Sequence, residues 1–150
     1  MADAFFRANV GACVLNDQGR VLALRRIGVR ESAWQMPQGG IERTETPAAA
    51  VLRELAEETG LPPEAVQVLA EHPGWLVYEV PVAWRNDKVG WGQAQKWFVL
   101  RARGDAVVRP DGVEFDAHDW FTPEQLLAHC AAFRRPTYER VLAFVAELSG

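Results

Sequence analysis

Residues 39–61 read GGIERTETPAAAVLRELAEETGL, and this stretch decides the fold. Pro47 suits the first turn of a helix, where its missing N–H is not needed. The residues after it are rich in Ala, Leu and Glu, which favour helix, and Gly60 suits the left-handed position that ends one. The sequence therefore predicts a helix over 47–59, preceded by a permissive glycine loop at 39–40.

Three acidic residues of this predicted helix lie on one face. At about 100° per residue, Glu57 and Glu58 fall about 60° and 40° on either side of Glu54. Such like charges repel by about 0.2–0.5 kcal/mol for each pair, and the last turns of a helix also disfavour anions. Divalent cations would offset this repulsion, because hard ions such as Mg²⁺ prefer carboxylate oxygens and often share substrate phosphates. The alternative is a solvated acidic face with Arg53 as an ion-pair partner.

The spacing of residues across this stretch favours the metal interpretation. It fits the pattern G-x5-E-x7-R-E-U-x-E-E-x-G-U, in which U is apolar, at Gly39, Glu45, Arg53, Glu54, Leu55, Glu57, Glu58, Gly60 and Leu61. This pattern is the Nudix box, and the chain resembles the Nudix hydrolases, which hydrolyse a nucleoside diphosphate linked to another group. The resemblance implies an α/β fold, the Nudix α/β/α sandwich with a mixed sheet between helices.

The resemblance also implies roles for the acids of the box. Glu57 and Glu58 would be the principal metal ligands, and Glu54 would be a third ligand or would orient the attacking water. The backbone carbonyl of Gly40 would add a ligand. The expected cofactor is Mg²⁺ or Mn²⁺, with two or more ions that activate water and neutralise developing charge.

Two further residues of the box have a supporting role in the resemblance. Arg53 and Glu45 would hold the helix and the preceding loop together by a charged contact. No covalent nucleophile is expected, because neither Cys13 nor Cys130 has a basic neighbour that would activate it.

The segments outside the box resemble one subgroup, the bacterial RNA 5′-pyrophosphohydrolases and the plant-type diadenosine polyphosphate hydrolases. The matching segments are 6–11 (FRANVG), 34–40 (WQMPQGG), 75–78 (WLVY), 92–98 (GQAQKWF), 114–116 (EFD) and 133–136 (FRRP). Within them, the resemblance makes Glu114 a late metal ligand or the catalytic base. An ordinary loop acid is the alternative, and the choice of base between Glu54 and Glu114 stays open.

Six other side chains are candidates for substrate binding, and these are Arg7, Arg26, Lys96, Tyr78, Phe133 and Arg134. The arginines and the lysine can bind phosphate oxygens, and guanidinium offers forked donors that keep their charge. The two rings can stack on a nucleobase. The alternatives are solvated surface cations and rings that pack in the core.

The rest of the sequence predicts further strands and helices. Strands are expected at 5–15 and 21–25 as a hairpin, at 66–71, 75–80 and 95–101, and in a short segment that ends near Trp120. Helices are expected from Pro123 to about Ala131, with Thr122 as the N-cap, and over 136–148. Strands before and after a central helix, followed by terminal helices, favour a mixed sheet covered on both faces.

The composition limits the kind of protein. The chain has 150 residues, 49% of them apolar, and 16 Lys+Arg against 20 Asp+Glu. This indicates one globular domain over 1–150, and its acidic balance disfavours binding to duplex DNA. No apolar run is long enough for a membrane span and no secretory signal is evident. Two cysteines in apolar surroundings favour a reduced, cytoplasmic setting, and the oligomeric state stays open.

The expected reaction is removal of pyrophosphate from the 5′-triphosphate end of single-stranded RNA. The alternative is asymmetric cleavage of diadenosine tetra- or pentaphosphate to ATP and a shorter nucleotide, since both substrates present a polyphosphate and a base. A domain that only binds nucleotides is a third hypothesis, which the complete set of acids in the box disfavours.

Overall fold

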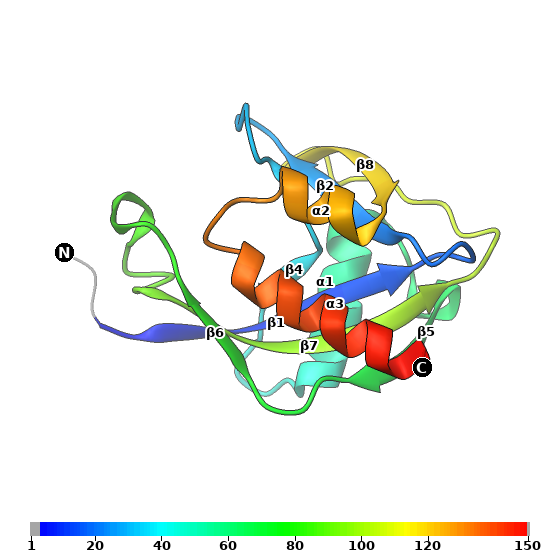
Figure 1. Cartoon of the computed structure of the whole chain (residues 1–150). Coiled ribbons are helices and arrows are strands. Elements are labelled where there is room, and N and C mark those ends of the chain that lie inside the picture. Colours follow the sequence, from blue (N-terminus) through cyan, green and yellow to red (C-terminus); the bar gives the residue numbers. More distant parts are fainter. Residues whose placement is uncertain (1–3, 150) are drawn as a thin grey trace.

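The computed structural model of the chain describes residues 4–149. Figure 1 shows a mixed sheet with helix α1 (Pro47–Thr59) behind it and helices α2 (Pro123–His129) and α3 (Arg135–Ser149) in front. The predicted α/β/α sandwich with a mixed sheet is therefore confirmed. Across residues 4–149 no helix combines the length and the apolar character that crossing a membrane requires.

The sheet is built around two long parallel strands. Strand β1 (Phe6–Leu15) pairs with β7 (Gly92–Ala102) along its whole length. The principal order is β3-β2-β1-β7-β5, while β4 pairs with β1, β6 with β7 and β8 with β2. The other strands are β2 (Val21–Arg26), β3 (Trp34–Gln35), β4 (Gln38–Gly40), β5 (Val66–Glu71), β6 (Leu76–Glu79) and β8 (Phe115–Phe121), and short 3₁₀ turns lie at Pro63–Ala65 and Val82–Trp84.

Helix α1 has the ends that its sequence predicts. The Thr46 hydroxyl accepts a hydrogen bond from the N–H of Ala49 at 3.2 Å and so caps the first turn. Gly60 adopts a left-handed φ of 73°, and its N–H donates to the carbonyl of Ala56. Because both caps are local features, the sequence alone was sufficient to place this helix.

Apolar side chains fill both faces of the sheet. Beneath α1, Val51 and Leu55 pack with Val10 of β1 and Phe98 of β7. The face beneath α2 and α3 holds a second set, which includes Trp97, Val99, Tyr138 and Val141. Strand β1 is buried on both sides from its middle onward, which is why its sequence is a continuous apolar run rather than an alternating one.

Three local predictions differ from the structure. The glycine segment at 39–40 belongs to strand β4, which pairs with β1 through Val10 and Gly39. The expected hairpin is limited to the pair Leu15 and Val21, because β2 pairs mainly with the distant strand β8. Strand β7 begins at Gly92 rather than Gln95, since its first residues pair with β6. All three depend on long-range strand pairing that local patterns do not contain.

Candidate active site

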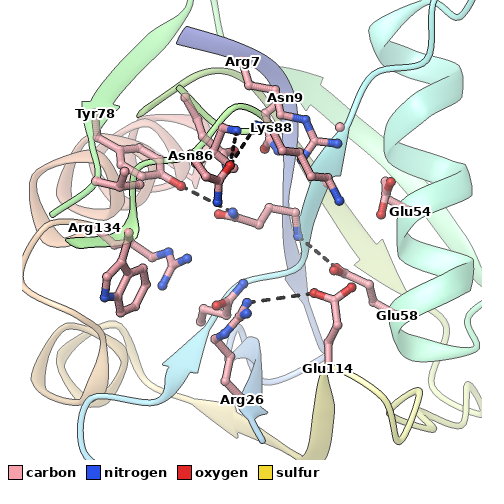
Figure 2. A pocket seen from close by; sticks show the side chains of 18 of the residues that line it. Arg7, Asn9, Arg26, Glu54, Glu58, Tyr78, Asn86, Lys88, Glu114 and Arg134 are labelled. Atoms are coloured by element: carbon pink, nitrogen blue, oxygen red, sulfur yellow. Dashed lines mark hydrogen bonds and ion pairs between the residues drawn. The ribbon is translucent and has the colours of Figure 1, made fainter. Parts of the chain in front are cut away.

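A cavity of about 400 Å³ opens between the edge of the sheet and the C-terminal half of α1. Figure 2 shows Glu54, Glu58 and Glu114 on one side of it, with Tyr78 and Arg134 on the opposite side. A volume of this size is typical of sites for small ligands, which span about 300–1,000 Å³. The cavity therefore has an acidic side and an aromatic side.

Arg53 organises the acidic side. Its Nε and Nη2 atoms donate to the two carboxylate oxygens of Glu45 at 2.7 and 2.8 Å, in a forked ion pair. Its Nη1 atom donates to Glu54 at 2.9 Å and to the more exposed Glu57 at 3.3 Å. Its Nη2 atom also donates to the carbonyl of Gly40 at 2.8 Å. One guanidinium thus ties α1 to β4 and to the loop that carries Glu45.

Glu58 is the most deeply buried acid of the site, with 4% of its surface exposed. Its carboxylate accepts a hydrogen bond from the backbone N–H of Gln38 at 3.0 Å. Burial raises the pKa of Glu58 well above its ordinary value, and repulsion from Glu54 raises it further. Residues 4–149 provide no ion-pair partner that would favour the charged form of Glu58, and a bound cation would supply one.

Glu54 is held against strand β4. A Cβ atom added to Gly39 would lie 1.9 Å from Cδ of Glu54, so a side chain at position 39 would displace the Glu54 carboxylate. Burial also raises the pKa of Glu54, although its hydrogen bond and ion pair with Arg53 partly counteract this effect. The close contact explains why the box requires a glycine at position 39.

Glu114 reaches the cavity from the loop before β8. Oδ1 of Asp111 accepts hydrogen bonds from the N–H groups of Val113, Glu114 and Phe115 at 2.9, 2.9 and 3.0 Å. The carbonyl of Glu114 accepts from Ile27 at 2.9 Å. Its carboxylate lies 3.9 Å from Arg26, as Figure 2 shows. The loop is therefore anchored, while the Glu114 side chain stays exposed at the edge of the cavity.

The aromatic side of the cavity is a cluster of rings beside an arginine. The ring centroids of Tyr78 and Phe133 are 5.7 Å apart, and those of Trp84 and Phe133 are 5.2 Å apart. The guanidinium of Arg134 lies 4.7 Å from the centroid of Phe133, and its Nε atom is buried without a hydrogen-bond partner among residues 4–149. This side offers flat apolar surface together with an unused donor.

The NUDIX domain family matches residues 5–141. The chain belongs to the Nudix family. Among its relatives, the RNA pyrophosphohydrolase of Zymomonas mobilis subsp. mobilis is 41% identical over 145 residues, covering 92% of this chain and 93% of the relative. Nudix hydrolase 26, chloroplastic, of Arabidopsis thaliana is 40% identical over 156 residues, covering 95% of this chain and 71% of the relative. The chain is therefore a Nudix hydrolase.

Solved structures of other Nudix enzymes show the same fold. The E. coli dihydroneopterin triphosphate pyrophosphohydrolase has a TM-score of 0.71 at 21% identity, covering 90% of this chain and 95% of that one. A C. elegans Ap4A hydrolase in a binary complex has a TM-score of 0.69 at 18% identity, covering 93% of this chain and 98% of that one. At these identities the likeness shows the common fold alone.

As a Nudix hydrolase, the protein needs divalent metal ions. Among the described residues, no three carboxylate, thiol or imidazole groups gather closely enough to hold an ion. Instead, Glu54 and Glu57 contact Arg53. The donors nevertheless fit a hard cation, because the carboxylates line one cavity and the buried charge of Glu58 lacks a counterion. These acids can hold a metal ion either by breaking their contacts with Arg53 or by binding the ion and Arg53 at the same time.

Most of the side chains proposed for this Nudix site line the cavity. They are Arg7, Arg26, Gly40, Glu54, Glu57, Glu58, Tyr78, Glu114 and Arg134. Phe133 lies behind the wall and supports Tyr78 and Trp84 rather than lining the space. The carbonyl of Gly40 lines the cavity but already accepts from Arg53.

Lys96, like Phe133, is a substrate-binding candidate that does not line the Nudix cavity. Its Nζ atom contacts Glu71 at 3.2 Å and the carbonyl of Gly74 at 3.4 Å. Position 96 follows Gln95 on β7, and successive side chains of a strand point to opposite faces. The charge of Lys96 is evident from the sequence, but its face of the sheet is not, and its part in substrate binding stays a prediction.

Several lining residues were not singled out from the sequence, and these include Asn9, Gln35, Gln38, Trp84, Lys88 and Gln93. Four of them lie in the segments 6–11, 34–40 and 92–98, which match the subgroup, and that match was the available signal. Trp84 and Lys88 lie in or beside the loop before β7, where no pattern of the sequence points to the cavity.

Proposed function

We propose that this Nudix hydrolase removes pyrophosphate from the 5′-triphosphorylated end of RNA. The observation that carries the proposal is that one cavity has an acidic side at Glu54, Glu58 and Glu114 and an aromatic side at Tyr78. A 5′-terminal nucleotide has the same division, because its phosphate chain needs cations and its base needs a flat apolar surface. The names of several relatives at about 41% identity support the same substrate.

The acids are proposed to hold the metal ions, either Mg²⁺ or Mn²⁺. Glu57 and Glu58 are the principal ligands, with Glu54 and Glu114 completing the set. When bound, such ions activate water, orient the phosphates and neutralise the charge that develops on them. Arg53 positions Glu54 and Glu57 through its hydrogen bonds and remains protonated, because its contacts with acids raise its pKa further above the ordinary value.

Two arginines are proposed to bind the phosphate chain between the two sides. Arg7 and Arg26 both line the cavity, and Arg26 lies beside Glu114. A guanidinium keeps its charge and offers several donors to phosphate oxygens. In the reaction, water adds across the anhydride between the α- and β-phosphates, which leaves a 5′-monophosphate on the RNA and releases pyrophosphate.

A comparison of substrates on one enzyme sample tests this proposal. Turnover of 5′-triphosphorylated RNA, diadenosine tetraphosphate and ADP-ribose is measured with Mg²⁺, and with Mn²⁺ in parallel. We expect the highest kcat/KM on RNA, with pyrophosphate and 5′-monophosphorylated RNA as products. Preference for diadenosine tetraphosphate would favour the alternative reaction, and preference for ADP-ribose would contradict both.

A pair of neighbouring arginines provides a matched control. Arg26→Ala removes a cation that lines the cavity and should lower kcat/KM by about 10-fold or more, as expected for lost charge-assisted bonds of about 1.5–3 kcal/mol. Arg25→Ala removes the preceding cation, which pairs with Asp116 at 2.8 Å, and should leave kcat/KM nearly unchanged. Equal losses in both variants would contradict the placement of the phosphates.

We propose a cytoplasmic location, where the two free cysteines stay reduced.

A further inference from the structure

A chain of buried amides lies behind the cavity wall. Asn9 and Gln38 line the cavity between its acidic side and Tyr78 on its aromatic side. Behind them, Gln95 and Trp97 of β7 are both 0% exposed. Alternate residues of this strand share one face of the sheet, which places Gln95 and Trp97 side by side on the face that α2 and α3 cover. These two residues cannot touch a ligand, so any effect they have on binding acts through the wall.

The indole of Trp97 determines how Gln95 is oriented. Nε1 of Trp97 lies 3.0 Å from Oε1 of Gln95. An indole N–H can only donate a hydrogen bond, so the amide atom that faces it must be the oxygen. The opposite orientation would bring two donors together inside the core, where an unsatisfied polar group is costly. The amide of Gln95 therefore has one allowed orientation.

The orientation of Gln95 in turn fixes the orientation of two amide side chains of the wall. Its Nε2 atom donates to Oδ1 of Asn9 at 2.9 Å and to Oε1 of Gln38 at 3.0 Å. An amide nitrogen has two hydrogens, so both are used by these contacts. Asn9 and Gln38 must each present their oxygen to Gln95. Their NH₂ groups consequently lie on the side of the amide that is away from Gln95.

The orientation of Gln38 in turn determines the hydrogen bond that Tyr78 makes. Nε2 of Gln38 donates to the Tyr78 hydroxyl oxygen at 3.4 Å, a contact drawn as a dashed line in Figure 2. Because the hydroxyl accepts from Gln38, its own hydrogen is available for a group in the cavity. The backbone N–H of the same Gln38 donates to Glu58 at 3.0 Å. One residue thus links the acidic side to the aromatic side.

We propose that Trp97 and Gln95 are positioning residues that make this wall a hydrogen-bond donor, and that the wall binds phosphate oxygens of the substrate. The inference deepens the proposed function and rests on it. Phosphate oxygens only accept hydrogen bonds, so they match the NH₂ group of Gln38 and the hydroxyl of Tyr78, while Asn9, which is 1% exposed, supports the wall from behind. If the two amides were reversed, the wall would present oxygens to a polyanion and repel it.

Two variants test the polarity of the wall. Trp97→Phe removes the indole donor and frees Gln95 to rotate. Gln95→Glu replaces the amide with a group that only accepts when ionised, which forces Asn9 and Gln38 to reverse. Val99→Ala is the matched control, because Val99 is 1% exposed on the same face of the same strand and lies outside the hydrogen-bonded chain.

Kinetics and binding are measured on all three variants with Mg²⁺. We expect KM for 5′-triphosphorylated RNA to rise at least tenfold in Trp97→Phe and further in Gln95→Glu, with a smaller change in kcat. The Kd of α,β-methylene-ATP, whose bridging carbon prevents cleavage at that position, should rise in parallel. Val99→Ala removes buried apolar volume without breaking the hydrogen-bonded chain, so it should lower the melting temperature and leave KM within about twofold. Equal KM in Trp97→Phe and Val99→Ala would overturn the inference.

An NMR measurement on the wild-type protein provides a second, independent test. The side-chain NH₂ signals of Gln38 should shift when α,β-methylene-ATP binds, and they should shift little in Trp97→Phe. Unchanged NH₂ signals in the ligand-bound wild type would overturn the inference, even if Gln95→Glu fails to fold. Shifted signals in a protein that does not cleave RNA would contradict the proposed function alone.

Discussion

At the scale of single residues, the site depends on acids whose charges are balanced by different partners. Glu57 is largely exposed and contacts Arg53, whereas Glu58 is buried against the N–H of Gln38. Glu45 lies outside the cavity and accepts hydrogen bonds from Nε and Nη2 of Arg53. The same residue type therefore serves as an anchor at Glu45 and as a proposed metal ligand at Glu57 and Glu58, and its surroundings decide which.

The contact between Glu45 and Arg53 predicts a pH dependence of stability. The hydrogen bond from Arg53 lowers the pKa of Glu45 from 4.5 to about 2. Because the folded pKa is lowered, the stabilisation is fully present above the unfolded value and is lost as the pH falls through the folded one. Glu45→Gln should lower the melting temperature at pH 7, and this difference should shrink between pH 4.5 and about 2. A difference that stays constant down to pH 2 would contradict the role of the carboxylate.

Asp111 provides a second prediction at this scale. Its Oδ1 atom accepts three backbone N–H groups in the loop that carries Glu114. Asp111→Ala removes this anchor and should lower kcat by about 10–100-fold, as loss of support behind a metal ligand commonly does. Asp111→Asn keeps an oxygen acceptor and should retain most of the activity. The prediction fails if the two variants have the same kcat.

At the scale of elements, the site is a contact between helix α1 and strand β4. The helix carries the acids, and β4 approaches it so closely that Gly39 leaves no room for a side chain. Strand β4 is held by its pairing with β1, which is itself fixed in the centre of the sheet. Activity should therefore be sensitive to the distance between these two elements.

Substitution of Gly39 tests this contact. In Gly39→Ala the new Cβ atom would lie 1.9 Å from Cδ of Glu54, so the acid or the strand must move. We expect a fall in kcat of about 100-fold or more, with a loss of stability of about 1–3 kcal/mol that leaves the fold intact. Gly104→Ala is the control, because Gly104 lies near Asp17, away from the cavity. Circular dichroism and steady-state kinetics on both variants decide the question.

At the scale of the whole molecule, metal binding and folding stability should be coupled. Glu54 and Glu58 are acids whose burial opposes their charge, and a cation would relieve this cost. Mg²⁺ or Mn²⁺ should raise the melting temperature, since a ligand at 100 times its Kd adds about 2.7 kcal/mol of stability. The increase should disappear with chelator and be strongly reduced in the double variant Glu57→Gln/Glu58→Gln. A shift that survives in this variant would place the ions elsewhere.

The accuracy of the sequence predictions follows from the range of the interactions involved. Helix α1 matches its predicted bounds because Pro47, Thr46 and Gly60 act within one turn of its ends. The contact of Lys96 with Glu71 was not predicted, because the direction of a side chain on β7 depends on how that strand faces the helices. The role of β4 was missed for the same reason, since its partner lies about 30 residues earlier in the chain.

By itself, the sequence determined the Nudix helix, the row of acids it carries and the class of chemistry that such acids support. These features depend on local capping and on the periodicity of one helix, both of which are written in consecutive residues. Only the tertiary structure decided which cations line the cavity and how Trp97 and Gln95 orient its wall. Those properties depend on the register of distant strands and on hydrogen bonds between residues such as Asn9 and Gln95, which no local pattern encodes.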